Sequence, residues 1–431
     1  MRQCLATALL LGLSTTVCAG TVIVHAAHLY DGQSDTPRHD VSVVVENALI
    51  VAVEPGLAQR AGAAVVELGQ ATLLPGFIDS HVHVAAKLPS RTNALEDALS
   101  HSDIDRAFDG ASFVRAMLQQ GFTTVRDLGG GDDTVALKHA IAAGRIEGPR
   151  ILTALEPLGP TAGHGDARSG LDPALQHVGW DNGRVDSADE ARLRVREHRR
   201  RGADLIKIMP SGGIASTGDD PRQLLMTDEE MRAAVDTAHA LGLKVAAHIY
   251  PAPAIEAAVR AGVDSVEHGS FATDQTFALM KAHGTFLVPT LSVFDVFYAT
   301  ARDRPDLLAP GTAAKELAND LLPKQNLPRA LRSSVRIAYG TDLGEGDHTL
   351  EFQLLIENGM APLAALRAAT SEAAALLGLA DHIGVIAPGH AADLVAVATD
   401  PAQDPASLRH ASFVMRDGTI YRRDNHPTVR D

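Results

Sequence analysis

Two histidines stand two residues apart at the end of an apolar stretch, in LLPGFIDSHVHV over residues 73–84. Such a run indicates a buried strand, in which polar groups without partners cost free energy. Residues two apart on a strand face the same side, so His81 and His83 could bind one metal ion through neutral imidazoles. Asp79 shares this face but lies deeper. The sequence leaves open whether it orients a histidine or only makes a local hydrogen bond.

Further polar residues follow later apolar segments: Lys207 in ADLIKIMPSGG, His248 in LKVAAHIY, His268 in VDSVEHGS and Asp342 in RIAYGTD. Each histidine alone is more often a hydrogen-bonded structural residue, and an aspartate before a helix is usually an N-cap. Lys207 is different, because a lysine inside LIKIM would bury an unpaired ammonium. Together with the two histidines above, these residues predict one site where several strands end.

The elements that would position these residues alternate between strand and helix. Candidate strands lie at 76–82, 122–127, 150–155, 204–209, 243–249, 264–267, 285–289 and 336–340. Capping-box spacing marks helix starts at Ser187 with Glu190 and at Thr227 with Glu230. Helix ends are expected at Gly121, Gly202, Gly242, Gly262 and Gly284. Eight alternations over about 300 residues predict an α/β fold with a (β/α)₈ TIM barrel, whose active sites form at the carboxyl ends of the strands. A doubly wound sheet is the alternative, but no GxGxxG fingerprint supports it.

The two ends of the chain have a different pattern, with short β-branched segments between turn residues. Asp417-Gly418 is a strong hairpin signal near the C-terminus. We therefore expect a small composite β-sandwich domain built from residues 20–74 and 380–431, with the barrel at 75–379.

Residues 1–19 have the pattern of a secretory signal peptide. Arg2 precedes the apolar stretch CLATALLLGL, and small residues precede Gly20. We expect cleavage after Ala19 and a secreted or periplasmic protein, with no membrane partner afterwards. The apolar stretch is shorter than the roughly 20 residues of a membrane span, although an uncleaved anchor is the alternative. Cys4 and Cys18 both lie in this segment, so the mature chain would have no disulfide and no thiolate ligand.

The formal net charge of the chain is −15. Nucleic-acid binding needs a basic surface, so this charge argues against a nucleic-acid partner. A homo-oligomer is possible, but nothing in the sequence defines its size. The segment 294–331, rich in Pro, Asp and Leu, is either a lid or contact surface or an ordinary loop and helix before the eighth strand.

The combination of PGFIDSHVH, a lysine on the fourth strand, histidines on the fifth and sixth, and GTD on the eighth resembles the amidohydrolase superfamily. The resemblance covers nearly all of the mature chain. Within it, TTVRDLGG, DLIKIMPSGG and AGVDSVEHGS are similar to the prolidase and imidazolonepropionase-like branch. That branch includes Xaa-Pro dipeptidases, carboxypeptidases and bacterial ochratoxin A-hydrolysing amidohydrolases.

The resemblance implies two divalent metal ions, with zinc expected. The first ion would be held by His81, His83 and Asp342, and the second by His248 and His268. Lys207 would carry a carbamate derived from CO₂ and bridge both ions. A carbamate supplies an oxygen ligand, whereas an ammonium has no lone pair. Two such ions generate hydroxide at neutral pH, and Asp342 would act as both ligand and proton shuttle during attack on a carbonyl group.

Substrate contacts are expected from two loops. His164 in TAGHGD follows the third strand, and Tyr250 follows His248 by two residues. Similar residues in this branch hold the α-carboxylate of a peptide-like substrate. Gly212 and Gly213 would let the backbone approach the ligand, or they form a simple turn. Arg222 is a further candidate cation for a carboxylate.

These expectations predict hydrolysis of the amide bond in N-acyl amino acids or dipeptide-like molecules, with release of the C-terminal amino acid. Ochratoxin A fits this description. A cyclic-amide hydrolase of imidazolonepropionase type, a deaminase and a non-catalytic small-molecule binding protein are the alternatives. Lys207 argues against the first two, because single-metal members of the superfamily generally lack the bridging lysine. The third typically lacks a ligand, and none is missing here.

Overall fold

The computed structural model describes residues 20–87, 92–172, 174–177, 179–319 and 322–424. The expected signal segment, residues 1–19, lies outside the described residues. No helix in these ranges is long and apolar enough to cross a lipid bilayer.

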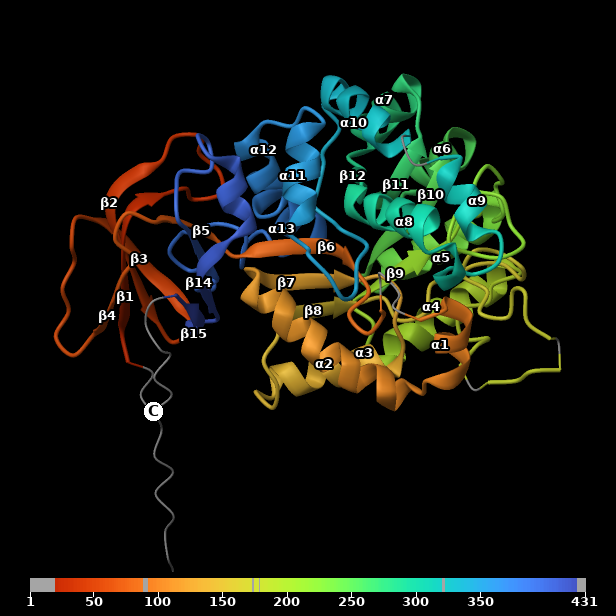
Figure 1. Ribbon diagram of the computed structural model, residues 1–431, viewed down its shortest axis with the longest axis horizontal. Helices are drawn as coiled ribbons and strands as arrows, with labels where there is room; N and C mark the ends of the chain where they lie inside the picture. The colour runs from red at the N-terminus through yellow and green to blue at the C-terminus, as the bar shows by residue number, and fades with distance from the viewer. Residues whose placement is uncertain (1–19, 88–91, 173, 178, 320–321, 425–431) are drawn as a thin grey trace, which may run out of the picture.

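Strands from both ends of the chain form one sheet of eight strands (Figure 1, red and blue). Its order is β15-β14-β13-β5-β1-β2-β3, with β4 beside β1. The strands are β1 (Val22–Leu29), β2 (Arg38–Glu46), β3 (Leu49–Pro55), β4 (Ala64–Glu67), β5 (Thr72–Pro75), β13 (Leu394–Val397), β14 (Ala411–Arg416) and β15 (Thr419–Arg423). β5 pairs with both β1 and β13. The N-terminal and C-terminal strands are therefore hydrogen-bonded into one sheet.

The middle of the chain forms two parallel sheets. The first has the order β6-β7-β8 and the second β12-β11-β10-β9. Their strands are β6 (Phe77–Val82), β7 (Phe122–Asp127), β8 (Arg150–Thr153), β9 (Leu205–Ile208), β10 (Lys244–Pro251), β11 (Ser265–Phe271) and β12 (Phe286–Val288). Seven of the eight expected barrel strands are thus present, with ends shifted by a few residues.

The eighth expected strand, 336–340, is wrong as a regular strand. The segment 335–343 makes only isolated parallel bridges, at Ile337 to Leu287 and at Leu343 to Val82. It bends away from a regular ladder because Asp342 has φ +59°, and the N–H groups of Thr341 and Asp342 both donate to the carbonyl of His81. A further bridge, Leu158 to Ile208, connects the end of the first sheet to the second. The described strands therefore do not form one continuous eight-stranded ring.

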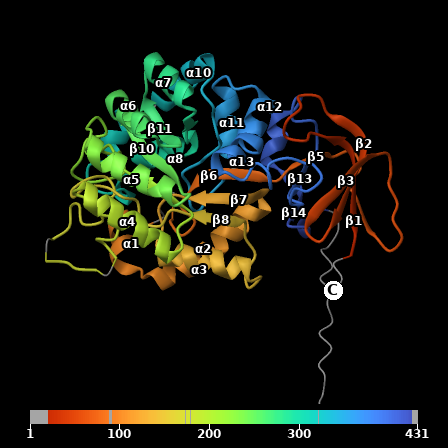
Figure 2. The ribbon, with the colours of Figure 1, turned by 180° about the vertical axis from the view of Figure 1, so that it is seen from behind.

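Helices surround the two parallel sheets (Figures 1 and 2). They are α1 (Ala94–Ser100), α2 (Asp103–Gln119), α3 (Asp132–Ala142), α4 (Ala188–Arg201), α5 (Asp228–Ala240), α6 (Ala252–Ala261), α7 (Asp274–His283), α8 (Leu291–Asp303), α9 (Thr312–Leu317), α10 (Leu322–Ser333), α11 (Leu350–Glu357), α12 (Pro362–Ala368) and α13 (Ser371–Leu377), with short 3₁₀ turns η1 (Pro305–Leu307) and η2 (Pro405–Arg409). The segment 294–331 is therefore mostly helical in its described part.

The caps show how the sequence defines these helices. Thr227 and Glu230 form the complete capping box expected at the start of α5. At α4, Ser187 accepts from the N–H of Glu190, but the Glu190 carboxylate accepts from Asp186 and not from Ser187. The expected box is therefore only half formed. Gly202 ends α4 in the left-handed conformation, with φ +105°.

Successive side chains along a β-strand point to opposite faces of the sheet, so one face packs against the helices and the other faces the site. Ile206 and Ile208 in β9 are fully buried in the main apolar core, which packs the strands against the helices. Lys207 lies between them and therefore points to the opposite side of the sheet.

Candidate metal centre

The carboxyl ends of β6, β9, β10 and β11, together with segment 335–343, surround one cavity of about 650 Å³, including its part open to solvent. Its lining includes all six residues expected to bind metal: His81, His83, Lys207, His248, His268 and Asp342. Their convergence is the geometry that the sequence predicts for residues at the carboxyl ends of parallel strands.

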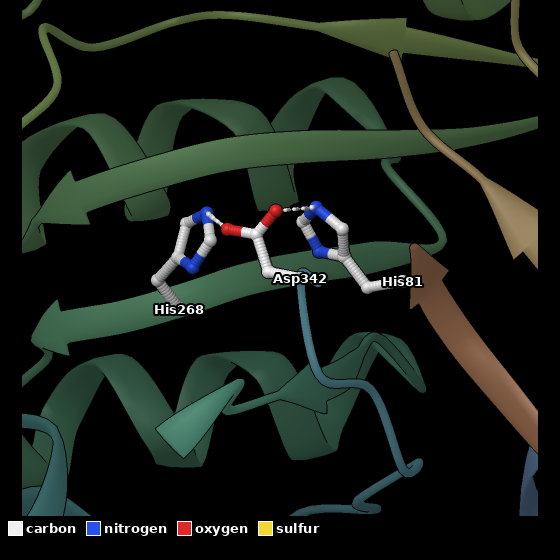
Figure 3. A group of neighbouring side chains, drawn as sticks. All are labelled: His81, His268 and Asp342. Carbon is white, nitrogen blue, oxygen red and sulfur yellow. Dashed lines mark ion pairs between the residues drawn. The ribbon is translucent and has the colours of Figure 1, made fainter. Parts of the chain in front are cut away.

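Asp342 lies at the centre of the cluster. Its Oδ1 is 2.8 Å from His83 Nε2 and 3.2 Å from His81 Nε2. Its Oδ2 is 3.9 Å from His268 Nε2, and Figure 3 shows the carboxylate between the rings of His81 and His268. One ligand atom from each of these three residues lies within 4.8 Å of the others. Burial alone would raise the pKa of Asp342, but the His81 charge and the hydrogen bonds from both histidines hold it well below its usual value.

The other ring nitrogens of these histidines are held by oxygen atoms. His81 Nδ1 lies 2.9 Å from Glu267 Oε2, and His83 Nδ1 lies 3.1 Å from the carbonyl oxygen of Gly129. In the neutral form, with the proton on Nδ1 and donated to its oxygen, each ring would present the lone pair of Nε2 to the centre of the cavity in place of the donated Nε2–H. This is the orientation that a metal-binding histidine needs.

His248 and His268 are close neighbours, with ring centroids 4.7 Å apart. Burial lowers the pKa of both imidazoles well below the usual value, so both are neutral and able to act as ligands. His268 Nδ1 lies 2.7 Å from Thr290 Oγ1. His248 Nε2 lies 3.4 Å from the carbonyl oxygen of Gly212, which leaves its Nδ1 for an ion.

Lys207 is 1% exposed. Within the described part of the chain, its ammonium has no hydrogen bond or ion pair. Burial lowers its pKa to about 8, although the carboxylates of Glu267 and Asp342 oppose this shift. A buried amine with a lowered pKa is more readily deprotonated, and the neutral form is the one that reacts with CO₂. The environment of Lys207 therefore fits carbamate formation.

A buried ion pair that the sequence analysis missed lies beneath His81. Arg126 in β7 is 2% exposed, and its Nη2 is 3.0 Å from Oε1 of the fully buried Glu267. Burial would raise the pKa of Glu267, but the Arg126 charge and the hydrogen bond from His81 lower it well below its usual value. Charged residues inside the apolar strands TTVRD and DSVEH carried the same signal as Lys207. That signal could have identified this pair.

The position of Asp79 settles the question that the sequence left open. Its Oδ1 accepts from the backbone N–H of His81 and of Thr341, each at 3.1 Å. Its Oδ2 accepts from Thr341 Oγ1 at 2.7 Å and lies 2.9 Å from His348 Nδ1. Asp79 therefore fixes the backbone on both sides of the site and orients no imidazole of the cluster.

His164 lies in the same cavity, as its loop position suggested. Its ring stacks on His248 with centroids 4.2 Å apart, and its Nδ1 is 2.8 Å from Ser216 Oγ. A Cβ on Gly213 would lie 2.1 Å from His164 Nδ1, so this glycine makes room for the ring. A Cβ on Gly212 would lie 2.2 Å from the carbonyl oxygen of Asp220. Both glycines serve the loop packing, and neither is among the residues that line the cavity.

Tyr250 also lines the cavity and stacks on His268 at 5.3 Å. The wall beside it is apolar and comes largely from α8, with Val293, Phe294 and Phe297. The sequence analysis did not identify this wall. The candidate Arg222 is not among the lining residues, and its guanidinium lies over the ring of Phe271 at 5.2 Å.

The donor set fits two divalent ions. Four imidazoles, one carboxylate and one lysine with a lowered pKa are ligands that zinc and similar ions accept, once the lysine carries a carbamate. The oxygen partners of the histidines supply the support that metal-binding imidazoles usually have.

Known proteins share this chain's sequence and its fold. Residues 72–422 match the Amidohydrolase family. An ochratoxinase from Aspergillus niger is 32% identical over 443 aligned positions, which cover 95% of this chain and 88% of the relative. The crystal structure of a Xaa-Pro dipeptidase with bound methionine superimposes with a TM-score of 0.88 at 30% identity, covering 94% of this chain and 100% of that one. A prolidase complexed with N-methylphosphonate-L-proline gives 0.86 at 32% identity, over 94% and 100%.

The match to the family covers most of the chain, and the matched region contains every residue of the metal cluster. The sequence-based resemblance is thereby confirmed. The chain belongs to the amidohydrolase family and is a hydrolase that acts on amide bonds.

Proposed function

We propose that this protein is a binuclear zinc amidohydrolase, which cleaves N-acyl amino acids or dipeptide-like substrates and releases the C-terminal amino acid. The observation that carries the proposal is the convergence of His81, His83 and His268 on Asp342 beside the buried Lys207. The relatives named ochratoxinase, Xaa-Pro dipeptidase and prolidase support the substrate class. Ochratoxin A belongs to this class.

The arrangement of the parallel strands bears on the fold of the catalytic domain. We propose that the two parallel sheets and segment 335–343 together form the (β/α)₈ barrel, with its domain at 75–379. The three isolated bridges described above support this arrangement, since they connect the sheets in the order a barrel requires. Residues 20–74 and 380–431 would form a composite β-sandwich domain, supported by the hydrogen-bonded strands that both ranges contribute.

The ligand assignment follows the side chains around the cavity. His81, His83 and Asp342 would hold one ion, His248 and His268 the other, and Lys207 as a carbamate would bridge them. When bound, the ions lower the pKa of water and polarise the scissile carbonyl. The oxygen partners, Glu267 for His81 and the Gly129 carbonyl for His83, would keep these two imidazoles turned toward the ions.

Asp342 would move the proton. Its lowered pKa keeps the carboxylate ionised at neutral pH and ready to accept a proton from the attacking water. The proton then passes to the leaving amine, which departs as the free amino group of the released amino acid. His164 and Tyr250 lie in the cavity wall, where they can hold the α-carboxylate of that amino acid. The apolar side chains of α8 would accept the substrate's hydrophobic part.

The test is a substrate panel read out by release of amino acids. We expect the protein to cleave N-acyl amino acids, dipeptides and ochratoxin A, and to contain about two ions per chain. Chelation should remove activity, and zinc should restore it. Asp342→Asn should abolish turnover even where metal is retained. Activity on cyclic amides alone, with none on this panel, would instead support the imidazolonepropionase-type alternative.

Secretion and assembly are part of the same proposal. We propose export with cleavage after Ala19, supported by the signal pattern of residues 1–19. N-terminal sequencing of the protein recovered from outside the cytoplasm tests this, and an intact Met1 would contradict it. Sedimentation of the purified protein would decide whether it forms a homo-oligomer.

A further inference from the structure

A second carboxylate lines the metal cavity. Two of the lining residues carry carboxyl groups, namely Asp342 and Glu316. Glu316 is 1% exposed and lies in α9, which packs against α8. The expected metal ligands come from strand ends, whereas Glu316 comes from the helices that close the cavity on its apolar side. The assigned chemistry of the centre makes no use of Glu316.

The neighbouring residue anchors α9 to the site. Lys315 Nζ lies 2.9 Å from the carbonyl oxygen of Gly213, 2.8 Å from that of Ser216 and 3.0 Å from Asp219 Oδ1. These contacts tie α9 to the loop after β9, which also holds His164 through Ser216. The backbone of Glu316 is therefore set in the cavity wall by a charged anchor.

The charge of Glu316 acts inside the cavity. Glu316 and Tyr250 line the same cavity, and Glu316 is almost completely shielded from solvent. Tyr250 is the proposed contact of the substrate's α-carboxylate. A second anion near it would repel a substrate that carries only negative charge, and would attract one that also carries a cation.

We propose that Glu316 binds a cationic nitrogen group of the substrate. This inference rests on the proposed function and narrows it, because the preferred substrates become dipeptide-like amides that carry a cationic group, rather than N-acyl amino acids whose only charge is the carboxylate. The cation is either the free α-ammonium of the acyl residue or the side-chain cation of the released residue. A carboxylate in a largely apolar wall distinguishes such groups strongly, because its interaction with a cation is little screened there.

Two matched substrate pairs separate the two sources of the cation. The first pair is L-alanyl-L-phenylalanine and its N-acetyl derivative, which differ in the α-ammonium. The second is N-acetyl-L-alanyl-L-lysine and N-acetyl-L-alanyl-L-norleucine, which differ in the side-chain cation. We expect the wild-type holoenzyme to prefer the cationic member of one pair by at least about 30-fold in kcat/KM.

Glu316→Gln keeps the size of the side chain and removes its charge. We expect it to abolish that preference, chiefly by lowering kcat/KM for the cationic member of the pair. Glu229→Gln is the matched control, because Glu229 is exposed in α5 and is not among the lining residues. It should retain the full preference. If Glu316→Gln does not fold, Glu316→Asp and the wild-type ratios still carry the test.

The outcomes are distinct. Equal rates within both pairs, or an equal loss on the cationic and non-cationic members in Glu316→Gln, would overturn this inference and leave the proposed function standing. Hydrolysis of no substrate in either pair or in the wider amide panel would overturn the proposed function, and this inference with it.

Discussion

The substitution Glu267→Gln tests whether the Glu267 carboxylate stabilises the fold and orients the His81 imidazole for metal binding. Glu267 is fully buried, and one carboxylate oxygen faces Arg126 at 3.0 Å while the other faces His81 at 2.9 Å. Removing one partner of a buried ion pair typically costs about 3–5 kcal/mol, because the remaining charge loses its compensation. Glutamine keeps one acceptor oxygen for the guanidinium, so we expect a loss near the lower end, about 3 kcal/mol in the free energy of unfolding.

The variant should also weaken metal binding. An amide that replaces the carboxylate no longer favours the His81 orientation that turns Nε2 to the cavity. Loss of such support typically lowers metal affinity by about 10- to 100-fold. The pKa of Glu267 is held well below its usual value, so its stabilisation is fully present at neutral pH. It is lost only as the pH falls through that lowered pKa.

Urea unfolding of metal-free and zinc-loaded protein measures both effects. The single tryptophan, Trp180, and circular dichroism report the transition. Glu229→Gln, exposed in α5, controls for the loss of one charge. The double variant Arg126→Met with Glu267→Gln should recover part of the lost stability, since no unpaired buried charge remains. A Glu267→Gln stability within about 0.5 kcal/mol of wild type, with unchanged zinc affinity, would refute the reasoning.

Two further predictions concern Lys207 and the loop after β9. The Lys207 pKa of about 8 predicts that zinc uptake by metal-free protein in bicarbonate increases as the pH rises through 8, since only the neutral amine reacts with CO₂. Lys207→Met should show no bicarbonate dependence, and a pH-independent wild type would contradict the assignment. Gly213→Ala would place a Cβ 2.1 Å from His164 Nδ1 and displace that ring. We expect kcat/KM to fall about tenfold or more. The double variant with His164→Ala should be no worse than His164→Ala alone, and additive losses would show that Gly213 acts elsewhere.

Much of the fold was predictable because its signals are local. Hydrophobic runs and glycine helix ends located seven strands, with β7 matching at both ends. The eighth strand failed because its irregular course depends on His81, whose carbonyl accepts from two successive N–H groups more than 250 positions away along the chain. The pairing of β5 with β1 and β13 is non-local in the same way, since it joins strands from both ends of the chain. No local pattern shows such pairing.

The candidate site divides in the same way. Its polar residues stood out in the sequence because each interrupts or ends an apolar segment, and a buried polar group needs a reason. Arg126 and Glu267 are also charged residues inside apolar segments, but the sequence analysis missed them. A charged residue on a strand does not show with which distant residue it forms an ion pair. Asp79 and Arg222 could be located in the sequence, but their roles depend on contacts with Thr341 and Phe271, which are distant in the chain.

The sequence by itself determined which residues could bind metal and on which side of each strand they lie. Two-residue alternation puts Lys207 opposite its isoleucine neighbours whatever surrounds the strand. Only the tertiary structure decided how these residues are oriented and what encloses them. Glu267 meets His81 across 186 residues of chain, and α8 and α9 bring the apolar wall and Glu316 over the strand ends. Contacts of this length arise from packing of the whole chain, so no stretch of sequence contains them.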